Sequence, residues 1–237
     1  MQREIIRRRK LHEEVAARLE SLIHSGQFAV GSKLPSERDL MGRFGVGRPA
    51  VREALLALER MGLVAISSGE RARVTKPTPE VLVGQLAGAA RNLLSQPEGI
   101  RHFQEARLFF ETGLARLAAE HADTADIAAL RQALTANRAA LGDMPAFERT
   151  DVAFHYELAL ISRNPIFTAL HQAMVEWLTR QRTVSLRGDG VDRLAYRSHR
   201  RICEAVAAGA PDRAEAAMRQ HLLEVADHYW KNVEGDT

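Results

Sequence analysis

The sequence predicts a mainly α-helical protein, with an N-terminal winged helix-turn-helix domain followed by an antiparallel all-α helical bundle. The first 76 residues contain short amphipathic helices, a glycine-rich turn and a hairpin pattern. The remainder contains longer helical stretches, several of which begin at a proline. Alanine, leucine and arginine are abundant and aromatic residues make up only 5%, a composition that favours helices. A chain of 237 residues is long enough for two such domains.

Charge is distributed unevenly between the two predicted domains. The first 76 residues carry 15 Lys and Arg against 9 Asp and Glu, a net charge of +6, whereas the rest carries 18 against 21, or −3. A basic module beside a mildly acidic one favours one nucleic-acid-binding domain and one domain with another task. The single cysteine, Cys203, excludes an internal disulfide framework and fits a reducing compartment. No apolar run approaches membrane-spanning length, so we expect a cytoplasmic protein without a membrane partner.

The chain begins with a basic arm, residues 1–10. We interpret it either as an extension that contacts DNA phosphates or as a frayed terminus. An amphipathic helix is predicted over Leu11–Ser25 and ends at Gly26, and we expect it to pack behind the helix-turn-helix.

The helix-turn-helix is predicted from Ser36 onward. Ser36 is a favourable N-cap, and Asp39 three residues later completes a variant of the capping box for a helix over Glu37–Phe44. The segment Gly45–Gly47 makes a sharp turn. Pro49 then lies in the first turn of a second helix, where its missing N–H costs little.

A wing is predicted after the second helix, which ends at Gly62. Two short β-prone runs, Val64–Ile66 and Arg73–Thr75, flank the segment Ser67–Glu70, which is typical of a hairpin tip. Gly69 in this tip has no Cβ, so its backbone can approach a DNA groove closely.

Arginines on this frame predict DNA binding. Arg48 and Arg52 are four residues apart and share one face at the N-terminus of the second helix, the end of a recognition helix that meets base edges in the major groove. An arginine there reads guanine O6 and N7 through two parallel hydrogen bonds. Arg38 on the first helix is placed to hold a phosphate. The alternative is an ordinary pattern of surface arginines on a small helical subdomain.

A proline-rich segment, Lys76–Pro79, separates the two domains, because nearby prolines can neither continue a strand nor lie inside a helix. We assign residues 1–76 to the DNA-binding domain, 77–79 to a linker and 80–237 to the helical domain, which we also expect to mediate dimerisation. Helices of the second domain are predicted near 80–94, 98–121, 125–140, 146–162, 166–186, 193–208 and 212–231, and their short links indicate an antiparallel bundle.

Four polar residues are predicted on apolar helix faces of the second domain. Asp151 and His155 are four apart on one helix, and His199 and His221 lie on two others. A buried carboxylate and buried imidazoles need partners, and one metal ion would satisfy all four groups. This ligand set suits Zn²⁺, with Ni²⁺, Mn²⁺ or Co²⁺ as alternatives. The competing interpretation is a core network in which Asp151 bonds one histidine and the other histidines bond backbone carbonyls.

Arg107 is predicted on the helix 98–121 with its stem toward the core. Its neighbour one turn later, Glu111, is an ion-pair partner in the structural interpretation. The functional interpretation is a clamp for the carboxylate of an effector, which the planar guanidinium matches. We expect the histidines outside the proposed metal site, among them His171 and His228, at the surface or at helix ends.

A metal-dependent enzyme that acts on a sugar acid is the rival interpretation, because such a site could activate water. Against it, we find no further inward Glu, Asp or His placed as a general base, and the basic first third would have no role. A third interpretation is a structural DNA-binding protein whose metal only stabilises the fold.

Three runs of the first domain, Leu34–Arg38, Arg48–Leu55 and Leu58–Val64, together resemble the winged-helix domain of the GntR superfamily of bacterial regulators. The resemblance implies that the arginines contact double-stranded operator DNA and that the glycine lies at the wing tip. The residues concerned are Arg38, Arg48, Arg52 and Gly69.

The second domain carries the elements Arg107…Glu111, Asp151-x-x-Phe154-His155, Asn164-Pro165, His199 and the run 218–222. Together they resemble the FCD effector domain of FadR-like GntR regulators. The resemblance implies a small carboxylate effector beside a divalent metal, with Arg107 and Asn164 as effector-binding residues. The metal ligands that it implies are Asp151, His155, His199 and His221.

Runs 69–74, 107–111, 118–122 and 164–167 are similar to the NanR-type repressors of sialic-acid catabolism, and this similarity covers nearly the whole chain after the basic arm. It implies a homodimeric repressor, not an enzyme, that leaves its operator when sialic acid or a related sugar acid binds. A regulator of another carboxylate, such as a uronate or a dicarboxylate, is the alternative.

Overall fold

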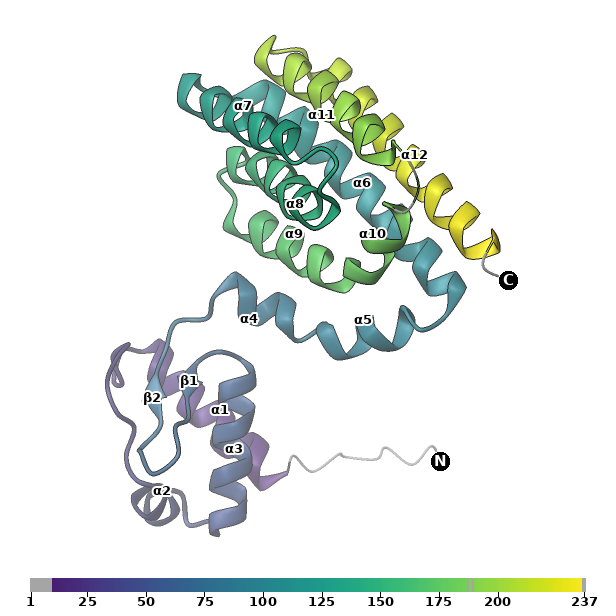
Figure 1. Ribbon diagram of the computed structural model, residues 1–237. Coiled ribbons are helices and arrows are strands. Elements are labelled where there is room, and N and C mark those ends of the chain that lie inside the picture. Colours follow the sequence, from purple (N-terminus) through teal and green to yellow (C-terminus); the bar gives the residue numbers. More distant parts are fainter. Residues whose placement is uncertain (1–9, 187, 189, 236–237) are drawn as a thin grey trace, which may run out of the picture. The chain divides into compact units, whose positions relative to one another are not determined.

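The computed structural model describes residues 10–186, 188 and 190–235 and divides into two compact units, Met1–Gln85 and Leu86–Thr237 (Figure 1). Helices dominate both units, and a two-stranded antiparallel hairpin lies in the first. The predicted fold class, a winged helix-turn-helix followed by a helical bundle, is confirmed. Residues 1–9 of the predicted basic arm lie outside the described residues. Within the described residues, no helix has both the length and the apolar character needed to cross a membrane.

The helix-turn-helix forms as its capping residues predict. The backbone N–H of Asp39 donates to Ser36 Oγ at 3.2 Å, and the N–H of Ser36 donates to Asp39 Oδ2 at 3.2 Å. Gly45 ends the first helix with a φ of 64°, in the left-handed region that glycine adopts without strain. The elements of this unit are α1 (Leu11–His24), α2 (Glu37–Phe44), α3 (Arg48–Arg60), β1 (Val64–Ala65), β2 (Arg73–Val74) and α4 (Pro79–Gly84).

A small apolar core holds the first unit together. Leu19 on α1, Leu40 on α2 and Leu58 on α3 are fully buried and meet Val64 and Val74 of the hairpin. Burial of these side chains between the three helices fixes the face that α3 turns outward.

The wing is a short, well-paired hairpin. Val64 pairs with Val74 and Ala65 with Arg73, and the N–H of Leu34 donates to Ala72 O at 2.8 Å along the outer edge of β2. The hairpin tip is exposed, and Gly69 within it has a φ of +77°. The tip conformation therefore favours glycine over residues with a Cβ.

The first compact unit ends at Gln85 and includes α4. The Gln85 side chain donates to Arg60 O at 2.5 Å, and Thr75 N donates to Leu63 O at 2.9 Å. The predicted helix 80–94 is consequently two helices, α4 and α5 (Ala87–Leu93).

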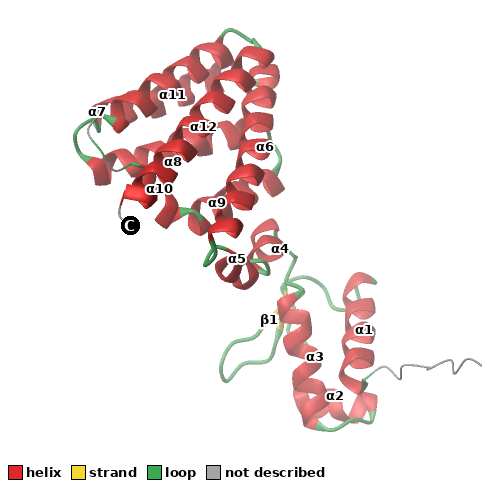
Figure 2. Ribbon diagram, turned by 90° about the vertical axis from the view of Figure 1, so that its right-hand side faces the viewer, coloured by secondary structure: helices red, strands yellow, loops and turns green. Residues whose placement is uncertain are grey.

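The second unit is a bundle of antiparallel helices (Figures 1 and 2). Prolines lie in the first turns of α6, α8, α9 and α12, as predicted. The predicted helix 166–186 breaks at Leu178, which leaves the helical conformation with φ −97° and ψ 12°. After α5, the elements are α6 (Pro97–His121), α7 (Thr124–Ala139), α8 (Met144–Ile161), α9 (Pro165–Trp177), α10 (Thr179–Ser185), α11 (Val191–Ala207) and α12 (Pro211–Gly235).

Helix α8 is the centre of this bundle. It packs against α6, α7, α9 and α11, while α12 lies along α6 and α11. Phe154 and Leu158 of α8 are buried in one cluster with Ile202 of α11 and Met218 of α12. Polar side chains on the inward face of α8 are therefore enclosed by three or more helices.

Candidate metal centre and DNA-binding surface

Four potential metal ligands converge in the centre of the bundle. Asp151 and His155 come from adjacent turns of α8, His199 from α11 and His221 from α12. All four residues are at most 5% exposed. One ligand atom from each residue lies within 4.8 Å of the others. The structure thus brings together the four residues that the sequence singles out.

The spacing of the ligand atoms fits one small divalent cation. His199 Nε2 lies 3.3 Å from His221 Nε2 and 3.3 Å from Asp151 Oδ1, and His221 Nε2 lies 3.3 Å from His155 Nε2. An ion held tetrahedrally at about 2.0–2.1 Å from each ligand atom separates those atoms by roughly 3.3–3.4 Å. One carboxylate and three imidazoles are a ligand set that Zn²⁺ and its first-row neighbours accept.

The protonation states of the cluster also suit a cation. Burial lowers the pKa of His199 to about 3 and that of His221 well below its usual value. Burial by itself would raise the pKa of Asp151, but His199, His155 and Arg182 outweigh this effect and lower it. At Asp151, His199 and His221 the site therefore presents a carboxylate and neutral imidazoles, the forms that bind metals.

Two buried residues that the sequence does not single out as site residues orient the imidazoles. Asn137 Oδ1 lies 3.0 Å from His199 Nδ1, and Glu111 Oε2 contacts His155 Nδ1. Both contacts occupy the Nδ1 side of the ring and leave Nε2 for the cluster. Such partners fix the tautomer and the ring orientation of metal-binding histidines.

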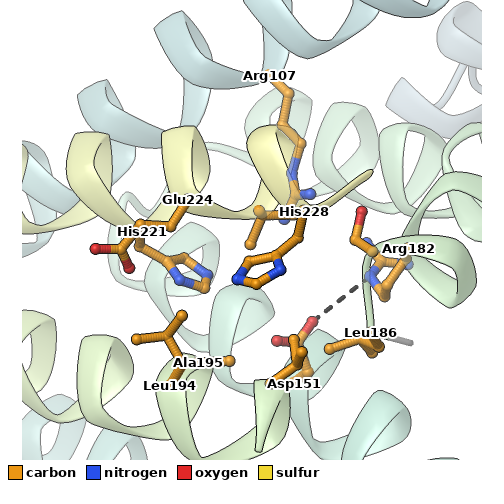
Figure 3. Close-up of a pocket in the computed structure, with 12 residues that line it drawn as sticks. Arg107, Asp151, Arg182, Leu186, Leu194, Ala195, His221, Glu224 and His228 are labelled. Atoms are coloured by element: carbon orange, nitrogen blue, oxygen red, sulfur yellow. Dashed lines mark ion pairs between the residues drawn. The ribbon is translucent and has the colours of Figure 1, made fainter. Parts of the chain in front are cut away.

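A recess adjoins the cluster and is shown in Figure 3. Asp151 and His221 belong both to the cluster and to its wall. The enclosed space is about 20 Å³, room for about one water molecule, within a hollow of about 430 Å³ counted out to solvent. The other polar side chains of its wall are Arg107, Arg182, Ser185, Glu224 and His228.

Arg182 on α10 is a cavity residue that the sequence pattern did not lead us to expect. Its Nε lies 3.5 Å from Asp151 Oδ2, the ion pair drawn in Figure 3, and has no hydrogen-bond partner among the described residues. The side chain is 6% exposed, and burial lowers its pKa. A signal was available, because Arg182 lies four residues from both Leu178 and Leu186 and so shares a helix face with two apolar residues.

Arg107 forms the ion pair that the structural interpretation predicts and also lines the recess. Its Nε donates to Glu111 Oε1 at 2.5 Å. Burial alone would lower the pKa of Arg107, but Glu111 outweighs burial and raises it. A permanently charged guanidinium therefore faces the cavity.

Asn164 lies away from this recess. It is the N-cap of α9, and its Oδ1 accepts from the N–H of Ile166 at 3.0 Å. It is not among the residues that line the cavity beside the cluster.

Two histidines differ from the expectation that they lie at the surface or at helix ends. His171 is 2% exposed on α9, and neither ring nitrogen has a hydrogen-bond partner among the described residues. Burial lowers the pKa of His171 to about 4. His228 lines the recess within α12. The sequence misled here because α9 and α12 bury more than one face.

The arginines predicted to bind DNA are exposed on the first unit. Arg48 and Arg52 lie at the start of α3, with side chains 65% and 68% exposed, and Arg38 is exposed on α2. Glu37 lies between the two α3 arginines, with its carboxylate oxygens 3.5 Å from Arg48 Nε and 3.8 Å from Arg52 Nε.

Two family models match the sequence. The model described as "Bacterial regulatory proteins, gntR family" matches residues 11–74, and the FCD domain matches residues 102–224. The chain belongs to the GntR family of bacterial regulatory proteins. As a GntR-family protein with an FCD domain, it is a DNA-binding transcriptional regulator and not an enzyme.

Curated relatives extend this family assignment. The chain is 47% identical over 220 residues to the HTH-type transcriptional repressor NanR of Edwardsiella tarda, a match that covers 92% of this chain and 85% of the relative. It is 45% identical over 233 residues to NanR of Salmonella schwarzengrund, covering 95% and 87%. The GntR-family chain is accordingly a transcriptional repressor.

A solved structure supports the fold. Streptococcus agalactiae GntR gives a TM-score of 0.54 at 24% identity, covering 90% of this chain and 98% of that one. At this identity the likeness concerns the fold alone.

Two buried residues contradict one of the reasons for setting the enzyme aside. From the sequence we expected no further inward acid or base, yet Glu111 and His171 are both buried in the second unit. Glu111 is already engaged by Arg107 and His155, so it is not free to act as a general base. GntR-family membership, and not an absence of acids, excludes the enzyme.

Proposed function

We propose that this protein represses genes of sialic-acid catabolism and releases its operator when a sugar acid binds beside a divalent metal ion in the bundle. The observation that carries the proposal is the convergence of Asp151 and three imidazoles at the wall of a recess that two arginines also line. The NanR repressors that resemble the chain along most of its length support the choice of sialic acid. A uronate or a dicarboxylate is the alternative ligand.

The metal site is assigned to Asp151, His155, His199 and His221, with Zn²⁺ as the expected ion and Ni²⁺, Mn²⁺ or Co²⁺ as alternatives. These four residues would hold the ion, and an ion that accepts a further ligand would supply a Lewis-acidic position for a carboxylate oxygen. Asn137 and Glu111 hold two of the imidazoles by their Nδ1 atoms, so that the four ligands stay aimed at one point.

The acid is recognised by charge and then by hydrogen bonds. Arg107 and Arg182 place two positive charges at the recess, and Arg182 Nε, which has no hydrogen-bond partner among the described residues, is a ready donor. Ser185, Glu224 and His228 on the same wall offer donors and acceptors for the hydroxyl groups of a sugar. This combination favours a hydroxylated carboxylate over a plain apolar acid. Asn164, at its helix cap, would act only through the position of α9.

The small size of the enclosed space couples binding of the acid to a conformational change of the bundle. About 20 Å³ is far too little for a sugar acid, so the ligand binds only a conformation in which the surrounding helices have separated. A ligand shifts a conformational equilibrium by its preference for one state. The acid therefore selects an open bundle, and the open bundle favours a domain arrangement that binds DNA weakly.

DNA is held by the first unit of each of two copies. Arg48 and Arg52 read base edges, Arg38 holds a phosphate, and the backbone around Gly69 approaches the adjacent groove. Two recognition helices one DNA turn apart would read a palindromic or repeated operator.

An exposed hollow on the second unit supports pairing between copies. Phe109 of α6 is 84% exposed at the rim of a hollow of about 320 Å³, and a Cβ at the neighbouring Gly113 would meet open space. In a homodimer with a two-fold axis, the projecting ring of each copy would enter the hollow of the other. Glu215 and Arg219 at the rim supply charges of opposite sign.

A binding experiment tests the proposed function. A fluorescent DNA fragment selected from random sequences by the metal-loaded protein is titrated with protein in the presence of N-acetylneuraminate, glucuronate or succinate. We expect N-acetylneuraminate to weaken DNA binding at least tenfold, and to do so only in metal-loaded protein. An affinity that none of the three acids changes would remove the mechanism. A response to glucuronate or succinate alone would identify that acid as the ligand and leave the proposed mechanism unchanged.

A further inference from the structure

One carboxylate touches both halves of the proposed effector site. Glu111 lies on α6 and is 4% exposed. Its Oε1 accepts from Arg107 Nε at 2.5 Å, and its Oε2 contacts His155 Nδ1. Neither Glu111 Oε2 nor His155 Nδ1 has another hydrogen-bond partner among the described residues. Among the described residues, Glu111 Oε2 and His155 Nδ1 therefore have only each other as polar partners.

The contact with His155 fixes which ring nitrogen is offered to a metal. With Nδ1 turned to the carboxylate, Nε2 points at the cluster and lies 3.3 Å from His221 Nε2. Because Glu111 Oε2 is an acceptor, the proton of a neutral His155 belongs on Nδ1, which leaves the lone pair on Nε2. A buried carboxylate on the far side also raises the basicity of the coordinating nitrogen.

The contact with Arg107 determines how the guanidinium is presented to the recess. Its Nε is occupied by Glu111, so the terminal nitrogens are the ones left for a ligand. Figure 3 shows Arg107 reaching into the space beside His228 and Arg182. Arg107 and His155 are on different helices, α6 and α8, and Glu111 joins them.

We propose that Glu111 is a positioning residue that orients the metal ligand His155 and the acid-binding Arg107 at the same time. Through it, the metal affinity and the acid affinity depend on one side chain. This inference rests on the proposed function, because it takes the cluster as the metal site and Arg107 as an acid-binding residue. Asn137 is the matched control residue. Its described contacts are with His199 and Thr150 and not with an arginine of the recess, so its substitution should change the metal affinity alone.

The chemistry of glutamine makes Glu111→Gln the decisive substitution. A carboxylate accepts at both oxygens, whereas an amide has one oxygen that accepts and one nitrogen that donates. Both partners of Glu111, Arg107 Nε–H and His155 Nδ1–H, are donors in the proposed state. The amide of the variant would therefore face one of them with a second donor, although the size and shape of the side chain are preserved.

The experiment compares wild type, Glu111→Gln, Glu111→Asp and Asn137→Leu as full-length proteins. Zinc affinity is measured by competition with a chromophoric chelator in the absence of any acid. Affinity for N-acetylneuraminate is then measured by calorimetry on protein saturated with zinc. Circular dichroism and thermal unfolding establish that each variant is folded. His171→Leu is the control for a buried substitution in the same unit, because His171 has no hydrogen-bond partner among the described residues.

We expect Glu111→Gln to lower zinc affinity 10- to 100-fold and, in zinc-saturated protein, to lower acid affinity at least tenfold. Asn137→Leu is expected to lower zinc affinity alone. Unchanged zinc affinity in Glu111→Gln, or unchanged acid affinity at zinc saturation, overturns the inference while the proposed function stands. A wild-type protein that binds neither zinc nor the acid overturns both together.

A measurement on the wild-type protein remains decisive if the Glu111 variants do not fold. Nitrogen-15 NMR of histidine-labelled, zinc-loaded protein reports which ring nitrogen of each histidine carries the proton. We expect the proton of His155 on Nδ1, with a strongly downfield proton resonance from its contact with a carboxylate. A proton on Nε2, or an Nδ1–H with the shift of a solvent-exposed imidazole, overturns the role of Glu111.

Discussion

Asn137 Oδ1 lies 3.0 Å from His199 Nδ1, and both side chains are fully buried between α7 and α11. This contact fixes the ring of one proposed metal ligand without touching the recess. Asn137→Asp retains an acceptor at this position and should keep zinc affinity within about threefold of wild type. Asn137→Leu removes the acceptor and should lower zinc affinity about 10- to 100-fold. Chelator competition measures both, and equal affinities in the two variants would contradict the role of Asn137.

Arg182 should contribute to acid binding through a charge that the free protein leaves partly unpaired. Arg182→Met removes a charge-assisted hydrogen bond worth about 1.5–3 kcal/mol, so calorimetry on zinc-loaded protein should show roughly a 10- to 150-fold weaker complex with N-acetylneuraminate. Arg180 lies on the same helix with an exposed side chain, and Arg180→Met should leave the affinity unchanged. Equal effects of the two substitutions would place the acid elsewhere.

Glu37 should restrain DNA binding because it lies beside both arginines of the recognition helix. Glu37→Gln removes a negative charge from the DNA-facing side and should strengthen binding to DNA of any sequence, with a steeper dependence on salt. Arg48→Ala is the opposite control and should weaken binding to the selected site by about 1–3 kcal/mol. Fluorescence anisotropy at several salt concentrations, with selected and random duplexes, measures both effects. Weaker binding of Glu37→Gln to random DNA would be the contrary result.

Phe109 should be required for pairing of the copies. Phe109→Glu places a charge at the rim of the apolar hollow and should convert a dimer into a monomer in light scattering coupled to size-exclusion chromatography. Leu223→Glu changes another exposed apolar residue, which is 53% exposed on α12, and should leave the dimer intact. A Phe109→Glu protein that remains dimeric would assign the interface to another surface.

His171 should make the metal-free protein sensitive to acid. Its folded-state pKa of about 4 lies below the value in an unfolded chain, so between these values the unfolded state binds more protons and the free energy of unfolding falls as the pH falls. The loss between pH 7 and pH 5 is about 2 kcal/mol for this one group. Urea unfolding in EDTA should show that His171→Leu reduces the loss by this amount. The exposed His102→Leu should not change it.

Local signals account for what the sequence predicted. Ser36 and Asp39 mark the start of α2, and prolines mark the starts of α6, α8, α9 and α12, because caps and prolines act within one helical turn. The i, i+4 pair Asp151 and His155 likewise shares a face wherever α8 lies. The apolar faces of their own helices also indicate that His199 and His221 point inward, and the family resemblance implies the same four ligands.

The residues that contact the proposed metal ligands could not be predicted from local sequence patterns. Asn137 and His199 are 62 residues apart, and the sequence pattern of neither helix indicates that the two side chains are in contact. Arg182 faces the cluster because the chain bends at Leu178, whereas a continuous helix over 166–186 would turn it elsewhere. The boundary of the first unit depends on contacts of α4 with residues near Gly62, which involve sequence neighbours on both sides of the proline-rich segment.

In the proposed mechanism, the small enclosed space of the recess would also set how quickly the protein responds to the acid. A ligand that enters only after the bundle opens has an association rate that levels off, at high concentration, at the rate of opening. Because the bound acid can leave only after the bundle opens, the same enclosure also slows its dissociation. The lag before derepression would then depend on how fast the helices around the recess separate. After a brief pulse of the sugar acid, bound acid would leave slowly, so derepression in the cell would last longer than the pulse.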